Sequence, residues 1–339
     1  MNLENNLLVL LAAVISFLVS ALMGKWMVPL LRRINFGQTI REVGPKWHKK
    51  KNGTPTMGGF LFIMGVFLAA AVCLPLYYGQ PSQDPALRSQ SLTKAVGGLL
   101  MALGFGLVGF IDDYIKVVKK RNLGLNVKQK LVLQFLVAGA YLLTLSLSGV
   151  GTATYVPFAG SVDLGIWFWI LSAIGIVGIV NAVNFTDGID GLNASVTFFV
   201  AVTFMVMAGI LQNGGMSIAA AAVAGGCLGF LVWNFNPAKV FMGDTGSLFL
   251  GGAVCALGFG VNMPVLVFPV GIVYLCEILS VVLQVVYFKA THGKRIFKMT
   301  PIHHHFELCG WSEIKICLVF SAVTILFGML SVFCVVYVL

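Results

Sequence analysis

The sequence is dominated by long apolar segments that alternate with short polar loops. Ten such segments can be delimited, and they cover residues 7–31, 57–78, 93–111, 130–149, 165–183, 192–211, 216–233, 246–262, 264–288 and 314–338. About 20 apolar residues are enough for a helix to cross a bilayer. Only 10% of the 339 residues are charged, whereas soluble domains carry about 25%. The pattern predicts an all-α integral membrane protein with ten transmembrane helices, forming one polytopic domain over residues 1–339.

The basic residues are concentrated in alternate loops. The loops that follow the first, third and ninth segments hold Arg32, Arg33, Arg41, Lys46, Lys49, Lys50, Lys51, Lys116, Lys119, Lys120, Arg121, Lys128, Lys130, Lys289, Lys294, Arg295 and Lys298. Basic loops remain in the cytoplasm, so both termini are predicted to be extracytoplasmic. The same rule accounts for the net charge of +10, and no nucleic-acid partner is expected. The basic residues follow the first segment, which predicts an uncleaved first span rather than a signal peptide.

Four polar clusters stand at segment ends that the charge pattern assigns to the cytoplasmic face. They are Asp112 and Asp113; Asn181, Asn184, Asp187 and Asp190; Asn234, Asn236 and Asp244; and His303, His304, His305 and Glu307. The charges of the loops assign all four clusters to one side of the membrane, and they do so independently of the motifs. The clusters are therefore expected to form one site, in a cleft on the cytoplasmic face.

The aspartates make up five of the 12 acidic residues in the chain. Neighbouring carboxylates repel one another, and a hard divalent cation removes the conflict. Mg²⁺ prefers oxygen ligands and shares them with substrate phosphates. The sequence therefore predicts a magnesium–phosphate site, with Lys51, Lys116 and Lys128 as candidate partners of phosphate oxygens.

Helical spacing separates the roles of the two adjacent aspartates. If the third helix continues, Asp112 and Lys116 lie one turn apart, whereas Asp113 points about 100° away. One aspartate then faces the metal or a nucleophile and the other a structural partner. Three consecutive histidines do not share one helix face, so one or two are expected in the site. Glu277 lies within the ninth segment, where a carboxylate is functional or paired, and we expect a structural partner in the bundle.

Each cluster also has a simpler interpretation. Asp112 and Asp113 could cap a helix, and Asp187 and Asp190 could form an Asx turn. The histidines could be a surface feature or a zinc or nickel site. An ion-coupled transporter is a different class of function, but transporters bind their ions near the bilayer midplane. Only Glu277 lies there.

The same motifs carry a family resemblance over essentially the whole chain. They are Lys51-Asn-Gly-Thr-Pro-Thr56, Asp112-Asp113-x-x-Lys116, Asn184-Phe-Thr-Asp187-Gly188-Ile189-Asp190, Asn234-x-Asn-Pro with Gly-Asp244-Thr-Gly-Ser, and Pro301-Ile-His303-His304-His305-x-Glu307. The sequence resembles the phospho-N-acetylmuramoyl-pentapeptide transferases, of the polyprenyl-phosphate N-acetylhexosamine-1-phosphate transferase superfamily. Sister N-acetylglucosamine-1-phosphate transferases share the aspartate motifs but differ in the histidine loop, and they remain the alternative.

The resemblance implies transfer of phospho-N-acetylmuramoyl-pentapeptide from its UDP-linked form to undecaprenyl phosphate, giving lipid I and UMP. It implies a Mg²⁺-dependent homodimer in the bacterial cytoplasmic membrane. It also implies that Asp244 binds the metal and that Asp112, Asp113, His303 and Asp244 are catalytic. The implied substrate-binding residues are Lys51, Thr56, Lys116, Lys128, Asn184, Asp187, Gly188, Ile189, Asp190, Asn234, Phe241 and His304.

Within that set, Gly188, Ile189, Asp190 and Phe241 correspond to the family's uridine pocket. Two mechanisms are open at this point. Asp112 could activate the lipid phosphate for direct attack on the donor, or an aspartyl-phosphate could form on one of the paired aspartates.

Overall fold

The computed structural model describes residues 3–33, 51, 53–80, 85–119, 123–156 and 158–338. Its elements are α1 (Leu3–Arg33), α2 (Gly59–Tyr78), α3 (Pro85–Val118), α4 (Val127–Leu147), β1 (Ala153–Val156), β2 (Gly160–Asp163), α5 (Ile166–Thr186), α6 (Leu192–Ile210), α7 (Gly214–Asn234), α8 (Gly243–Gly260), η2 (Pro264–Leu266), α9 (Val267–Val270), α10 (Ile272–Ala290), α11 (Ile302–Leu308) and α12 (Glu313–Val338). The predicted loop cations Arg41, Lys46, Lys49, Lys50, Lys120 and Arg121 lie outside the described residues.

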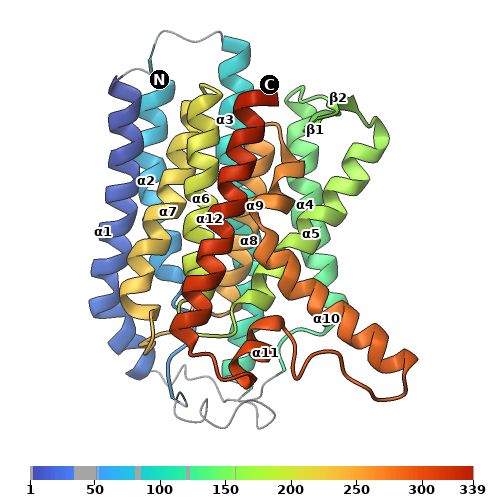
Figure 1. Cartoon of the computed structure of the whole chain (residues 1–339). Coiled ribbons are helices and arrows are strands. Elements are labelled where there is room, and N and C mark those ends of the chain that lie inside the picture. Colours follow the sequence, from blue (N-terminus) through green and yellow to red (C-terminus); the bar gives the residue numbers. More distant parts are fainter. Residues whose placement is uncertain are drawn as a thin grey trace.

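Most of the described chain is helical, and the long helices form one bundle (Figure 1). Nine of the described helices are long and apolar enough to cross a membrane: α1 to α7, α10 and α12. This confirms the expected class of helical membrane protein. The structure adds an antiparallel hairpin that was not predicted, with Ala153 opposite Asp163 and Val156 opposite Gly160.

The eighth predicted segment forms α8, which is not among the nine candidate spans. It is rich in glycine and carries Asp244 in its first turn. The count of ten spans therefore stays a prediction. Both ends of the described chain lie at the end of the bundle opposite α11 (Figure 1). We call the other end, where α11 lies, the α11 end.

The prediction of a single helix over the ninth segment, residues 264–288, is wrong. The chain instead forms the short helices η2 and α9, breaks at Gly271 and then begins α10. Pro264 and Pro269 lack a backbone N–H, which interrupts the helical hydrogen-bond series. As a result α10 is tilted away from the rest of the bundle and its last turns protrude (Figure 1).

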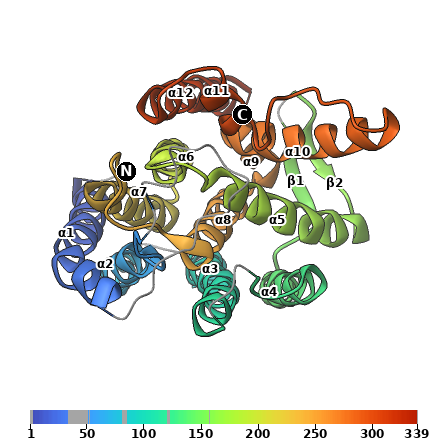
Figure 2. The same ribbon diagram turned by 90° about the horizontal axis from the view of Figure 1, so that it is seen from below.

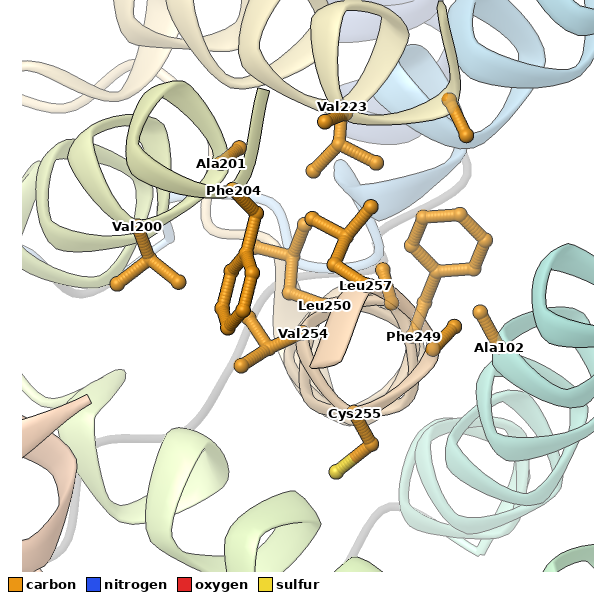
Figure 3. Close-up of a cluster of buried hydrophobic side chains, with 14 of the residues drawn as sticks. Ala102, Val200, Ala201, Phe204, Val223, Phe249, Leu250, Val254, Cys255 and Leu257 are labelled. Carbon is orange, nitrogen blue, oxygen red and sulfur yellow. The ribbon is translucent and has the colours of Figure 1, made fainter. Parts of the chain in front are cut away.

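Helix α8 runs through the middle of the bundle (Figure 2). Every residue from Thr245 to Gly260 is buried. Its side chains Phe249, Leu250 and Val254 lie among residues of α3, α6 and α7, such as Ala102 and Phe204 (Figure 3). A helix enclosed on all sides has little room to shift, so the residues of its first turn are held in fixed positions.

Glycines let the helices of this bundle approach closely. A Cβ atom added to Gly229 of α7 would lie 2.5 Å from the carbonyl oxygen of Phe17 in α1, and one added to Gly59 of α2 would lie 2.6 Å from the backbone nitrogen of Gly246 in α8. Lipid tails are as apolar as the side chains they replace, so membrane helices associate largely through close packing at small residues.

We expect Gly229→Ala to destabilise the protein by about 1–3 kcal/mol, because the added methyl group meets the backbone of a neighbouring helix. Thermal unfolding in detergent would measure this loss. Gly178→Ala in α5 is the matched control, since nothing lies within 4 Å of its added Cβ atom. Equal melting temperatures for the two variants would contradict the packing argument.

Candidate active site

Three carboxylates meet at the α11 end of the bundle. Asp112 and Asp113 lie near the end of α3, and Asp244 lies in the first turn of α8. Each of the three offers an oxygen, and these oxygens lie within 4.8 Å of one another. Helix α3 continues beyond the pair, as its sequence suggested, so Lys116 Nζ lies 2.6 Å from Asp112 Oδ2 one turn earlier. The cluster is therefore built by two helices that are distant in sequence.

Asp113 binds the N-terminus of α8. Its carboxylate accepts hydrogen bonds from the backbone N–H groups of Asp244 (3.2 Å) and Thr245 (2.9 Å) and from the Thr245 hydroxyl (2.8 Å). The first N–H groups of a helix have no partner within the helix, and they carry the positive end of its dipole. Asp113 is thus the aspartate with a structural partner, and it fixes the position of Asp244.

Asp244 is paired with two ammonium groups. Its Oδ2 atom lies 2.9 Å from Nζ of both Lys116 and Lys130. Burial raises the pKa of Asp244, but Lys130 and Lys116 more than offset this effect and hold the pKa well below its usual range. Asp244 is therefore ionised at neutral pH. Three carboxylates against two ammonium groups leave the cluster suited to a further cation.

Asn184, at the end of α5, also reaches this cluster. With its amide nitrogen turned towards Asp244, it donates to Oδ1 of that residue at 3.1 Å, and its oxygen accepts from Lys130 at 3.3 Å. In the opposite orientation of the amide, its oxygen would face the Asp244 carboxylate and its nitrogen would face the Lys130 ammonium group. Asn184 therefore lies in the site, as predicted.

A second charged cluster lies around Asp190. Lys51 Nζ is 2.6 Å from Asp190 Oδ1 and 2.6 Å from Glu313 Oε2. The other oxygen of Asp190 accepts from Asn236 at 3.1 Å and from the backbone N–H of Ala238 at 2.9 Å. The buried carboxylate thus joins the segment before α2 to the loop after α7, while Glu313 at the start of α12 contacts Lys51 and the Asp190 backbone N–H at 2.9 Å.

The predicted residue Asn234 supports the same region from α7. Its side-chain oxygen accepts from the backbone N–H of Gly191 at 3.1 Å, and its side-chain nitrogen donates to the carbonyl oxygen of Val240 at 2.9 Å. Asn234 is buried. Through these two hydrogen bonds, Asn234 connects the backbone just before α6 to the backbone of the loop before α8.

Asp187 stands between the two clusters, at the end of α5. Burial raises its pKa well above the usual range, and the neighbouring carboxylates of Asp244, Asp113 and Asp190 raise it further. A carboxyl group in this setting gains from any nearby positive charge. The carboxylates that raise its pKa thus belong to both clusters.

The histidine loop reaches the same place through α11. His303 is fully buried, and its Nδ1 atom lies 3.0 Å from Glu277 Oε2. A Cβ atom on Gly188 would collide with the His303 ring, so the ring packs directly on the turn that follows Asp187. This close approach requires glycine at position 188.

The other two histidines point elsewhere, as expected for consecutive residues of one helix. His304 Nδ1 lies 2.6 Å from Glu307 Oε2. His305 Nδ1 accepts from the backbone N–H of Lys298 at 3.1 Å. His303 therefore packs against the turn at Gly188, and the His304 ring lies beside it, tilted by 58°, with ring centroids 4.1 Å apart.

Residues 55–58 line the site through backbone contacts with the loop before α8. Phe241 N–H donates to the carbonyl oxygen of Pro55, and Gly58 N–H donates to that of Phe241, each at 2.8 Å. A Cβ atom on Gly243, which has φ of +70°, would lie 2.7 Å from Thr56 Oγ1. The predicted residues Thr56 and Phe241 thus adjoin the first turn of α8, where Gly243 leaves them room.

Two site residues were not predicted from the sequence, and one predicted residue, Lys128, is exposed. Lys130 was counted only as a topological charge, although the Asn126 capping box that begins α4 sets it one turn into that helix. Glu313 carried no signal, because it meets Lys51 across 262 positions of chain. The predicted Lys128 is exposed on the first turn of α4.

Comparison with known proteins agrees with these motifs. The family described as glycosyl transferase family 4 matches residues 95–262, and phospho-N-acetylmuramoyl-pentapeptide-transferase signature 1 matches residues 51–63. The chain is 46% identical over 325 residues to the phospho-N-acetylmuramoyl-pentapeptide-transferase of Desulforamulus reducens, covering 95% of this chain and 94% of that protein. It is 44% identical to the one of Halalkalibacterium halodurans over 96% of each chain, and 43% identical to the one of Bacillus mycoides over 98% of each.

We expect Asp187→Asn to raise the melting temperature at neutral pH and to have little effect in acid. A raised pKa means that the folded state holds the proton more tightly than the unfolded state. The resulting stability is present below the unfolded-state pKa and is lost as pH rises through the folded-state pKa. Asparagine stays neutral, so it avoids this loss. Thermal unfolding at acidic and neutral pH would test this, and the same shift at both would contradict it.

Proposed function

This chain belongs to the family of phospho-N-acetylmuramoyl-pentapeptide transferases, and we propose on that basis the substrates, metal and residue roles of its reaction. The chain is a transferase of peptidoglycan precursor synthesis. It transfers phospho-N-acetylmuramoyl-pentapeptide from the UDP-linked donor to undecaprenyl phosphate, giving lipid I and UMP. The enzyme works in the bacterial cytoplasmic membrane as a homodimer, with ten spans that include α8.

The observation that carries the proposal is the cluster of Asp112, Asp113 and Asp244 with Lys116 and Lys130. Phosphoryl transfer depends on positioning and on charge neutralisation more than on covalent work by the protein. The cluster supplies both kinds of charge at the end of the apolar bundle. A lipid acceptor held in the membrane and a water-soluble donor can meet only at such a boundary.

The α11 end faces the cytoplasm in this proposal, and both termini lie outside. Arg32 and Arg33 end α1 at this end of the bundle, where Lys116 and Lys298 also lie. Basic residues favour the cytoplasmic side. The nucleotide donor therefore arrives on the side where the charged clusters open.

The donor set fits Mg²⁺. Its three carboxylates provide hard oxygen ligands close together, and Mg²⁺ takes one or two protein carboxylates beside substrate phosphates. Asp244 is the proposed protein ligand, because it is ionised and lies between α3 and α4. Bound there, Mg²⁺ would neutralise charge on the donor's diphosphate.

The chain's own residues then divide the work. Asp112 orients the lipid phosphate, and an oxygen of that phosphate attacks the β-phosphorus of the donor while the bond to UMP breaks. Lys116, Lys128 and Lys130 stabilise the phosphate oxygens, and Asp113 keeps Asp244 in place. His303, His304 and Asn184 complete the phosphate-facing surface. Lys51, Thr56, Asp187 and Asn234 line the donor cleft, and Gly188, Ile189, Asp190 and Phe241 bind uridine.

The competing mechanism places an aspartyl-phosphate on Asp112 or Asp113. Asp113 already accepts three hydrogen bonds from α8, which favours Asp112 as the reacting carboxylate in either mechanism. Incubation of enzyme with donor and labelled UMP, without lipid acceptor, separates the two. Exchange of label into the donor, or a trapped phosphoaspartate, would overturn direct attack.

The function is tested with radiolabelled donor, undecaprenyl phosphate and purified enzyme, with and without Mg²⁺. We expect labelled lipid product only with Mg²⁺ and only from UDP-N-acetylmuramoyl-pentapeptide. UDP-N-acetylglucosamine is the control donor substrate, because the sister transferases transfer N-acetylglucosamine-1-phosphate. Turnover of that donor in place of the pentapeptide donor would assign the chain to the sister activity.

Asp244→Asn should lower kcat by at least about 10³-fold, since it removes the charge that binds the metal and pairs with both lysines. The protein should remain folded, because the isosteric amide still fits the first turn of α8. Asp163→Asn, in the hairpin at the opposite end of the bundle, removes a carboxylate as a control. Near-normal turnover by Asp244→Asn across a Mg²⁺ titration would refute the metal assignment.

A further inference from the structure

Glu277 of α10 and His303 of α11 form a hydrogen-bonded contact inside the protein. Both side chains are fully buried. Glu277 Oε2 lies 3.0 Å from His303 Nδ1, and it also accepts from the His303 backbone N–H at 3.4 Å. The remaining polar atoms of the pair, Glu277 Oε1 and His303 Nε2, have no hydrogen-bond partner among the described residues.

The chemistry of the pair determines which nitrogen carries a proton. A carboxylate only accepts hydrogen bonds, so the contact with Oε2 requires a proton on Nδ1. The partner of one ring nitrogen thereby decides what the other nitrogen can do. Nε2 is left to exchange a proton or to accept a hydrogen bond, and it lies against Gly188, beside Asp187.

A buried carboxylate in an apolar helix is costly unless it is paired. An apolar side chain would fill this position of α10 without that cost. The loop is also held by a second residue of the same helix, because Gln284 accepts from the backbone N–H groups of Ile296 and Phe297 at 3.1 and 3.0 Å. Attachment of the loop therefore does not explain why Glu277 contacts the imidazole ring.

We propose that Glu277 is a positioning residue for the transfer reaction. It keeps the proton on Nδ1 of His303 and aims Nε2 at the site between the two charged clusters. This inference rests on the proposed function of His303, and it extends the expectation of a purely structural partner. Glu277 itself does not contact the substrate.

A double-mutant cycle tests whether Glu277 acts through His303. Glu277→Gln keeps the size of the side chain, but its amide can donate as well as accept, so the proton on Nδ1 is no longer enforced. We expect kcat to fall about 10–100-fold, with the KM for donor little changed. In a His303→Asn background the same change should have no further effect. An equal loss of kcat in both backgrounds would overturn the proposal.

Ser280→Ala is the matched control for a disturbance of α10. The Ser280 hydroxyl donates to the carbonyl oxygen of Glu277 at 2.7 Å, and Ser280 is also buried. This variant alters the backbone bonding of Glu277 while leaving its carboxylate intact. We expect wild-type kcat. A loss that matches Glu277→Gln would assign the effect to helix packing and overturn the proposal.

Nitrogen NMR of ¹⁵N-histidine-labelled protein tests the same inference without turnover. The His303 signals are identified by their loss in His303→Asn. We expect a protonated Nδ1 in the wild-type protein, and a mixture of tautomers in Glu277→Gln. A wild-type Nδ1 without a proton would overturn the proposal. Because no substrate is present, this result stands apart from the donor assay that tests the function.

Discussion

The site depends on the contact between the Asp113 carboxylate and the first backbone N–H groups of α8. This contact ties the end of one helix to the start of the most enclosed helix of the bundle. Asp244 follows from it, since that residue lies in the first turn of α8 and can move only with the helix. A site whose proposed metal ligand is held by a buried core is preorganised, so little reorganisation is needed when charge develops during the reaction.

The second constraint is the repulsion among carboxylates, and the protein resolves it differently in its two clusters. Around Asp244 the balancing charges are Lys116 and Lys130. Around Asp190 the balancing charge is Lys51, while backbone and amide donors complete the bonding of its second oxygen. In the first cluster two ammonium groups balance Asp244, whereas in the second one ammonium group is shared by Asp190 and Glu313. This difference supports chemistry at the first cluster and recognition at the second.

Sequence reasoning succeeded where contacts are local or where a motif is compact. The pairing of Asp112 with Lys116 follows from helical spacing, and the separate role of Asp113 follows from the angle between adjacent residues. It failed where tertiary structure decides. Lys130 and Glu313 meet partners more than a hundred positions away, and no local pattern marks them. The ninth segment was read as one helix because its composition is apolar, although its prolines break it after a few residues.

The ion pairs of Lys51 have a consequence for how the enzyme matures in the cell. Lys51 precedes α2, whereas its partner Glu313 begins α12, which is synthesised much later. Until α12 is inserted, Lys51 lacks one of its two carboxylate partners and Asp190 lacks the backbone contact that Glu313 makes with it at 2.9 Å. The junction of Lys51, Asp190 and Glu313 is therefore completed only after α12 has been synthesised and inserted. A nascent chain that still lacks α12 therefore holds Lys51 and the Asp190 backbone N–H without their shared carboxylate partner.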